Sequence, residues 1–144
     1  ASATRVTISS INGKSLAKLD TIKLRVKAYK LVNGKKKYID NSVMLHIVTN
    51  SSKYTNIKKV LLPQKSYVLG VKQTIQLKPG YIKADASKMV LDGTHGARYL
   101  YVSTNKNVAT VDAKGRIKAK AAGKCTVYVI TVNGTTQAVQ IIVK

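Results

Sequence analysis

The stretch NVATVDAKGRIKA, residues 107–119, decides how this chain folds. It predicts a short strand, a tight turn and a second short strand. The turn runs from Asp112 to Gly115, because aspartate accepts local backbone N–H groups and glycine adopts positive φ at little cost. On the strand that follows, Ile117 and Ala119 are expected to face inward, since successive side chains of a strand point to opposite sides of the sheet. The same alternation directs three basic side chains to solvent: Arg116, Lys118 and Lys120.

Strand-forming residues dominate the rest of the chain as well. Val, Ile, Thr and Tyr recur throughout, and helix signals are poor, so an all-β fold is predicted. The best helix candidate is a turn or two around residues 83–90. Residues 81–96 otherwise have an irregular pattern. Strands are expected over residues 57–62, 66–69, 72–77, 97–103, 125–132 and 137–143, the second and third of them as a pair.

Two strings around the opening stretch carry a family resemblance. Residues 101–115 read YVSTNKNVATVDAKG, and residues 122–127 read AGKCTV. This pattern resembles the bacterial immunoglobulin-like domain of group 2, over residues 56–144. That family usually has Trp two residues before the Ser, where this chain has Tyr101, so the resemblance places Tyr101 in the core. It implies a small β-sandwich, used as a repeat in bacterial surface and secreted proteins, without catalytic residues.

Residues 5–49 repeat landmarks of the later segment in the same order. Gly13 aligns with Gly115. Asn33-Gly34 aligns with Asn133-Gly134, each pair predicted as a two-residue hairpin turn. The flanking apolar positions also correspond: Ile22, Leu24 and Val26 with Cys125, Val127 and Val129, then Val43, Leu45 and Ile47 with Val139, Ile141 and Val143.

The predicted fold is therefore an immunoglobulin-like β-sandwich in two unequal parts. Residues 1–52 form the C-terminal strands of a partial repeat, and residues 53–144 form a complete domain. The first part exposes an apolar face, so we expect it to pack on the second or to recruit strands from another copy.

Charge is the strongest functional signal. The chain holds 26 Lys and Arg against 5 Asp and no Glu, a formal net charge of +21. A lysine-rich codon bias would enrich Glu as well, so we interpret the imbalance as suited to an anionic partner. Such partners include cell-wall polymers, acidic glycans, anionic membrane surfaces and nucleic acid. The candidate contacts are Lys23, Arg25, Lys27, Lys35, Lys36 and Lys37 on one hairpin, and Arg116, Lys118 and Lys120 on the opening stretch.

Other site chemistries find little support in the sequence. Cys125 lies mid-strand in an apolar run and is interpreted as a buried structural thiol. His46 and His95 are far apart and lack carboxylate neighbours, and the five Asp are scattered singly, so no catalytic residue, metal or cofactor is predicted. Tyr81 and Tyr99 flank the irregular segment and are the candidate glycan contacts. A Lys–Asn isopeptide crosslink would need a buried acid beside the pair, and is not favoured.

These observations predict a non-catalytic repeat module of a bacterial surface or secreted protein. It would act as stalk, spacer and adhesion domain outside the cell, with a basic surface touching acidic cell-wall or host glycans. Two alternatives stay open at this point: an accessory carbohydrate-binding module of a larger secreted enzyme, and a polyanion-binding or nucleic-acid-binding module of the phage type. Other domains of a larger parent chain are expected partners, and no stretch is long and apolar enough for a membrane helix.

Overall fold

The computed structural model describes residues 6–91 and 97–144, and of Asn41 it describes the backbone alone. Asp92 and His95, which were considered and not favoured as parts of a metal or catalytic site, lie outside the described residues. Within the described residues the chain is a succession of strands. Its one helical segment there is a three-residue 3-10 turn, far short of the length that would cross a membrane. The predicted all-β class is confirmed.

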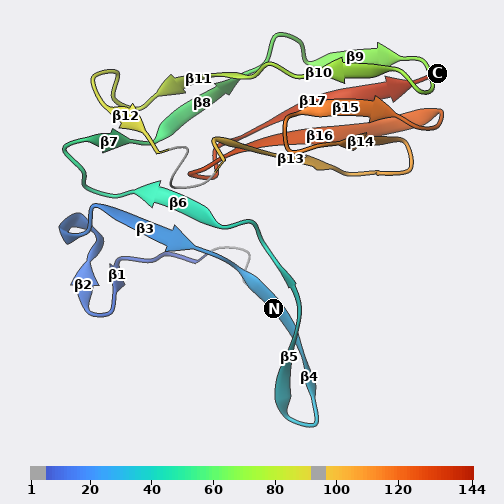
Figure 1. Ribbon diagram of the computed structural model, residues 1–144. Helices are drawn as coiled ribbons and strands as arrows, with labels where there is room; N and C mark the ends of the chain where they lie inside the picture. The colour runs from blue at the N-terminus through green and yellow to red at the C-terminus, as the bar shows by residue number, and fades with distance from the viewer. Residues whose placement is uncertain (1–5, 92–96) are drawn as a thin grey trace.

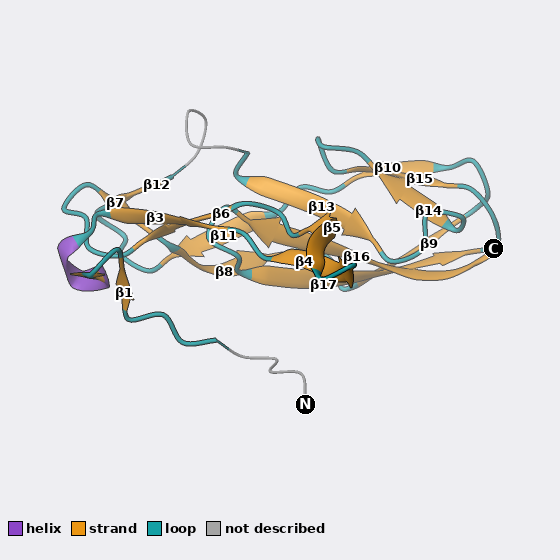
Figure 2. Cartoon of the chain, turned by 90° about the horizontal axis from the view of Figure 1, so that it is seen from below, coloured by secondary structure: helices purple, strands orange, loops and turns teal. Residues whose placement is uncertain are grey.

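The larger unit is a sandwich whose strands run along one long axis (Figures 1 and 2). One sheet has the order β13-β16-β17-β9, and a second has the order β10-β15-β14. A separate pair, β8 with β11, packs on β16 and β17, and the short strands β7 and β12 pair at the end nearer the first segment. The bounds are β7 Tyr54–Thr55, β8 Ile57–Leu61, β9 Ser66–Leu69, β10 Thr74–Gln76, β11 Gly80–Lys83, β12 Met89–Val90, β13 Tyr99–Ser103, β14 Ala109–Val111, β15 Arg116–Ala119, β16 Gly123–Thr131 and β17 Thr136–Val143.

The core lies between the two sheets. Ile117 and Ala119 enter it from β15, while Val127 and Ile141 enter it from β16 and β17. All four are at most 1% exposed. The basic side chains that alternate with them on β15 are exposed, so the predicted inward and outward faces of the opening stretch are confirmed. Burying each of the larger three, Ile117, Val127 and Ile141, stabilises the fold by about 1.5–3 kcal/mol.

Tyr101 packs on this core beside the turn that follows β14. The turn has three residues between Asp112 and Arg116, and Gly115 lies in it at φ +80°. A Cβ on Gly115 would stand 2.7 Å from Cζ of Tyr101, so only glycine leaves room for the ring. Tyr101 is half-buried, and that burial raises the pKa of its hydroxyl. The ring therefore contacts the core as predicted, but at its edge.

The predicted pairing of β9 with β10 is wrong. β9 runs parallel to β17, and β10 runs antiparallel to β15 in the other sheet. A tight turn from Gly70 to Gln73 carries the chain across, held by the Gly70 N–H, which donates to the Gln73 side chain at 2.7 Å. Leu69 and Leu77 then enter the core from the two sides. Two neighbouring strands that feed opposite sheets have the same period-two pattern as a hairpin, which explains the error.

The helix predicted near residues 83–90 is also absent. The Asp85 carboxylate accepts the Ser87 N–H at 3.0 Å and the Ser87 hydroxyl at 2.6 Å. Such local bonds compete with helical ones and favour a turn. The chain before this turn is regular, because β11 pairs with β8, so the prediction of an irregular segment is wrong for residues 81–83. The hydrogen bond from the Ser87 hydroxyl is the main reason that the pKa of Asp85 is lowered.

The first segment contributes shorter pairs. β3 pairs with β6, and β4 pairs with β5, in the same antiparallel sense as β16 with β17. A small β1–β2 hairpin precedes them. The bounds are β1 Ser10–Ile11, β2 Lys14–Ser15, η1 Leu16–Lys18, β3 Thr21–Leu24, β4 Lys27–Val32, β5 Lys35–Asn41 and β6 Leu45–Val48.

The glycine turns of the two segments differ, contrary to prediction. Asn33 and Gly34 both have positive φ, 51° and 73°, and form a two-residue turn between paired Val32 and Lys35. At the corresponding place in the later segment only Gly134 has positive φ, and Thr131 N–H bonds to Thr135 O across a three-residue turn. Gly13 similarly belongs to a two-residue turn and Gly115 to a three-residue turn. The division into a partial and a complete repeat stays a prediction.

The first segment packs on the second through β6. The His46 N–H donates to the Val132 carbonyl at 2.8 Å, and the side chain of Leu45 lies against Gly134. Asn56 bonds both backbone groups of Val48, at 2.9 and 2.8 Å. Packing on the second segment is one of the two arrangements expected for the apolar face of the first. This packing covers β6, whereas the β4–β5 hairpin extends away from the sandwich (Figure 1).

Candidate functional site

The β4–β5 hairpin, called the ribbon from here on, places its basic residues on both of its faces. Opposite residues of an antiparallel pair share a face. Lys36 lies opposite Leu31, on the face of Tyr29 and Tyr38, whereas Lys37 lies opposite Lys30 on the other face. The three lysines 35–37 therefore alternate. A run of adjacent residues cannot share one face of a strand, so a ligand on either face of the ribbon meets only some of these lysines.

One face of the ribbon carries a ladder of cations and rings. Lys27 Nζ lies 5.3 Å from the centre of the Tyr38 ring, and Lys36 Nζ lies 4.8 Å from the centre of the Tyr29 ring. The two rings meet edge to face, with centres 6.2 Å apart. These contacts cross the strands and stabilise the pair, although the residues are exposed.

Lys23 and Arg25 do not belong to the ribbon. Lys23 lies on β3, opposite His46. Together with Met44 and Leu100 it lines a recess of about 300 Å³ where the two segments meet. Arg25 is exposed in the break between β3 and β4. The chain bends there, where Val26 and Ser42 exchange hydrogen bonds. The first predicted basic hairpin is thus divided between two places.

The second basic group lies on the outer face of the three-stranded sheet. Lys118 stands between Thr74 of β10 and Thr110 of β14, in one row across the sheet. Arg116 occupies the next row, opposite Gln76. A shallow groove of about 490 Å³ follows these rows, lined by Lys72, Thr74, Thr110, Val111, Asp112, Arg116 and Lys118. We call it the basic groove. Lys120 is exposed just beyond β15 and outside the groove lining.

The acidic residue in the basic groove is already engaged by the backbone. The Asp112 carboxylate accepts the N–H groups of Lys114 and Arg116, both at 2.9 Å. The Arg116 N–H is the main reason that the pKa of Asp112 is lowered. Within residues 6–91 and 97–144, no carboxylate lies at ion-pair distance from Lys72, Arg116 or Lys118. Their cationic heads remain open to an anion.

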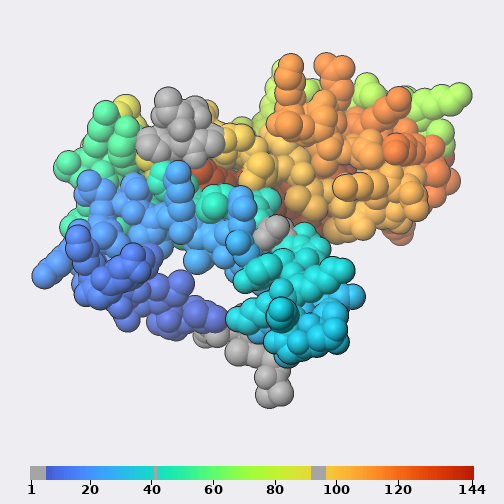
Figure 3. All heavy atoms as spheres, turned by 60° about the horizontal axis from the view of Figure 1, so that its bottom comes forward, coloured from blue at the N-terminus to red at the C-terminus, as the bar shows by residue number. Residues whose placement is uncertain are grey.

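The ribbon and the basic groove lie in separate parts of the molecule. The ribbon projects below the sandwich, and β10 and β15 lie at its upper right-hand end (Figure 1). In Figure 3 the ribbon forms a distinct cyan lobe beneath the orange sandwich. The sequence grouped both as one kind of basic surface, but a compact ligand cannot touch both. Lys72, Thr74 and Thr110 were missed by sequence reasoning, since nothing in the sequence pairs β10 with β15.

The two candidate glycan tyrosines lie near each other. Tyr81 is half-buried, and the Arg98 guanidinium lies 5.2 Å from its ring centre. Tyr99 packs on the core, and its hydroxyl is buried without a partner among the described residues. That burial raises the pKa of Tyr99. Tyr99 is therefore not the exposed glycan contact that the sequence predicts. The ring of Tyr81 is partly exposed to solvent.

Among the described residues considered for catalysis, Cys125 and His46 have separate surroundings. Cys125 is 5% exposed and contacts the Ser103 hydroxyl, as expected of a structural thiol. His46 is buried and its Nε2 lies 3.1 Å from the Thr21 hydroxyl oxygen. In the described part of the chain, no three His, Cys, Asp or Glu residues gather as a metal site would require.

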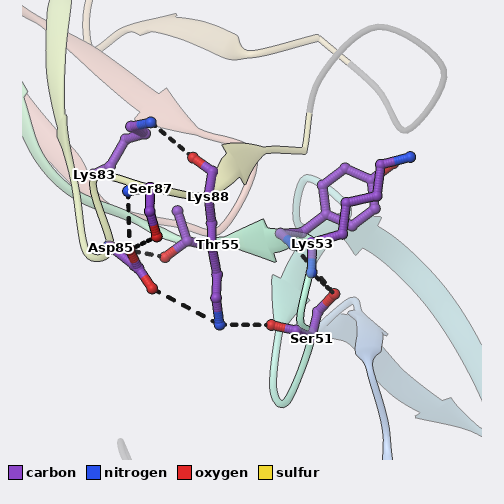
Figure 4. A network of polar contacts seen from close by, with 8 residues as sticks. Ser51, Lys53, Thr55, Lys83, Asp85, Ser87 and Lys88 are labelled. Carbon is purple, nitrogen blue, oxygen red and sulfur yellow. Dashed lines mark hydrogen bonds and ion pairs between the residues drawn. The ribbon is translucent and has the colours of Figure 1, made fainter.

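Polar side chains fasten the end of the sandwich where the two segments meet. Lys88 Nζ donates to the Ser51 carbonyl at 2.8 Å and lies 3.8 Å from the Asp85 carboxylate (Figure 4). Lys83 Nζ donates to the Lys88 carbonyl at 2.7 Å. Farther in, the Asn133 side chain bonds both backbone groups of Ile57 at 3.0 Å. With Asn56, which bonds Val48 in the same manner, Asn133 ties β6, β8 and the β16–β17 turn together.

Comparison with protein families gives a match. Residues 57–143, more than half of the chain, match the family described as bacterial Ig-like domain (group 2). The recognised resemblance and the immunoglobulin-like sandwich are thereby confirmed. Such a match supports a non-catalytic Ig-like module. Among curated proteins none matches this sequence.

Solved structures resemble this chain at low sequence identity. The S-layer protein rSbsC aligns with 93% of this chain at 11% identity and a TM-score of 0.51, and this chain spans 21% of its length. Intimin in the intimin–Tir90 complex aligns with 58% of this chain at 18% identity and a TM-score of 0.44, over 45% of its own length. The cadherin domains 1–4 of protocadherin gamma B7 align with 90% at 13% identity and a TM-score of 0.45, over 32% of that chain. This chain thus spans less than half of each.

Proposed function

Because this chain belongs to the bacterial Ig-like domain family, group 2, we propose that it is a spacer and adhesion module of a bacterial surface or secreted protein. In this proposal it works outside the cell without a catalytic centre, beside other domains of a larger parent chain. The basic groove contacts acidic cell-wall polymers or acidic host glycans. The observation that carries the proposal is the row of cations and hydroxyls on the outer face of the three-stranded sheet.

The basic groove suits an extended anion better than a compact one. Arg116 and Lys118 alternate on β15, so their side chains emerge about 7 Å apart. The hydroxyls of Thr74 and Thr110 flank Lys118 and can donate to sulfate, phosphate or carboxylate oxygens. Because no carboxylate within residues 6–91 and 97–144 lies at ion-pair distance from these cations, a linear polyanion meets several of them at once and releases its counterions.

The junction supports the spacer part of the proposal. The Asn56 side chain binds the backbone N–H and carbonyl of Val48 across the junction, and the Asn133 side chain binds those of Ile57 within the sandwich beside it. Paired bonds of this kind resist bending more than single ones, because both must break together. A spacer that carries force or sets a distance benefits from such a junction.

The test is salt-titrated binding of the chain to heparin, teichoic acid and duplex DNA. If about three cations engage a duplex-like polyanion, log K falls with log salt at a slope of about −3. Arg116→Gln together with Lys118→Gln removes two of these cations, so the slope should become shallower by about 2. The matched control is Lys58→Gln with Lys59→Gln, two exposed lysines of β8. If no polyanion binds at low salt, the basic groove is a solvated face and only the spacer role stands.

One observation favours a second candidate, the accessory carbohydrate-binding module. Tyr81 and Arg98 present a ring and a cation side by side. A glycan array separates the two candidates. Neutral sugars bound through Tyr81, and lost in Tyr81→Ala, would favour the carbohydrate module. Binding that follows polymer charge alone would favour the basic groove.

A further inference from the structure

The ribbon exposes apolar side chains where no other described strand covers them. Leu31 and Ile39 are 66% and 61% exposed, and Val32 is 44% exposed. Both β4 and β5 pair only with each other among the described residues. A two-stranded ribbon of this kind is marginally stable by itself in water. Its apolar side chains gain from a second surface that removes them from water.

The apolar tip of the ribbon is framed by cations. Leu31 and Val32 come directly before the Asn33-Gly34 turn, and the register places Lys36 and Lys35 opposite them. Lys30 and Lys37 form the next pair on the face of Val32. A lysine can bury its methylenes beside an apolar neighbour while its ammonium group reaches polar surroundings. Leucine and valine at the end of a projecting basic hairpin therefore match a surface that is apolar beneath an anionic layer.

We propose that the tip of the ribbon docks on an anionic phospholipid surface. Leu31 and Val32 enter the headgroup region, and Lys30, Lys35, Lys36 and Lys37 lie at the lipid phosphates. A soluble polyanion would pair with these cations but leave Leu31 and Val32 in water, whereas an anionic bilayer satisfies both groups. Tyr29 and Tyr38, with apolar rings and polar hydroxyls, suit the same interface. The docking is peripheral, and it is independent of the basic groove.

The chain contains no Trp, so a single introduced Trp reports on its own surroundings. Leu31→Trp places the reporter at the ribbon tip. The matched control is Val68→Trp on β9, where the native side chain is 57% exposed. With vesicles of phosphatidylglycerol and phosphatidylcholine in equal parts, the Leu31→Trp emission should shift to the blue and acrylamide quenching should fall several-fold. The Val68→Trp emission should not change, and neither variant should respond to phosphatidylcholine alone.

A second pair of variants separates charge from insertion in vesicle sedimentation. Lys35→Gln, Lys36→Gln and Lys37→Gln together should abolish binding. Leu31→Ser with Val32→Ser should bind at low salt and detach at physiological salt, whereas the unmodified chain stays bound.

Three results would overturn the proposal. One is an unchanged Leu31→Trp emission with the anionic vesicles. Another is an equal blue shift with heparin, which would assign the ribbon to soluble polyanions. The third is a blue shift without vesicles that grows with protein concentration, which would show that a second copy covers the tip.

Discussion

The chain forms two long antiparallel hairpins, each around an Asn-Gly pair. One hairpin is buried in the core and the other is exposed. β16 and β17 are flanked by β13 and β9, and their inward side chains form the core. β4 and β5 have no flanking strand among the described residues, and nearly every side chain of the ribbon is exposed. The same turn dipeptide and the same alternation thus produce a core element in one place and a projecting arm in another. Strand pairing is local, and burial depends on which other strands are within reach.

The largest expected contrast comes from one isoleucine on each hairpin. Ile141 on β17 is fully buried, while Ile39 on β5 is 61% exposed. Ile141→Ala should lower the free energy of unfolding by about 2–5 kcal/mol, because it removes buried methyl groups and leaves a cavity. Ile39→Ala should change it by less than about 0.5 kcal/mol. Urea denaturation of both variants measures this, and equal losses would show that the ribbon is packed in solution.

The two kinds of glycine turn give the next contrast. Gly115 and Gly34 both have positive φ, but a Cβ on Gly115 meets the Tyr101 ring and one on Gly34 meets nothing within 4 Å. Gly34→Ala should cost about 1–2 kcal/mol for the left-handed backbone alone. Gly115→Ala should cost about 1–3 kcal/mol more, because the ring must move. Thermal unfolding gives the comparison, and similar costs would mean that Tyr101 yields freely.

The asparagines of the two Asn-Gly pairs should respond differently to replacement by glycine. Asn33 has φ 51°, a conformation that glycine adopts readily, so Asn33→Gly should change stability by less than about 0.5 kcal/mol. Asn133→Gly should cost about 1–3 kcal/mol, since the buried Ile57 N–H loses its side-chain acceptor, while the Ile57 carbonyl keeps the Thr135 hydroxyl. Hydrogen exchange at the Ile57 amide should accelerate in Asn133→Gly. An unchanged exchange rate would contradict a stabilising role for the hydrogen bonds between Asn133 and Ile57.

The smallest effect concerns Asp112, the acidic residue of the turn that contains Gly115. The turn of Gly34 has no acidic residue. Folding lowers the pKa of Asp112, so its carboxylate stabilises the fold above the unfolded pKa of about 3.8. That contribution is lost as the pH falls from there through the folded pKa. Asp112→Asn should therefore melt slightly below the unmodified chain at neutral pH, and the gap should narrow as the pH falls below about 3.8. A gap that is constant with pH would show that the carboxylate charge has no part in the turn.

Much of the sandwich could be predicted from sequence, because its information is local. The period-two alternation of Arg116 to Ala119 fixed which side chains point inward, and the bounds of β9, β16 and β17 follow from apolar runs between turn residues. The positive φ of Asn33, Gly34 and Gly115 follows from what asparagine and glycine tolerate. The net charge, and the exposure of the lysines that produce it, needed no coordinates.

Tertiary structure decided everything that depends on distant partners. Asn33-Gly34 and Asn133-Gly134 are the same dipeptide, but the second turn differs because the Asn133 side chain holds Ile57, 76 residues away. β9 and β10 share a hairpin's pattern, yet each joins a different sheet. The basic groove exists only because β10 pairs with β15, and the cations of the first segment were separated by a bend at Val26. A sequence sets the direction of each side chain relative to its own strand, whereas a surface is assembled by strands whose pairing long-range packing selects.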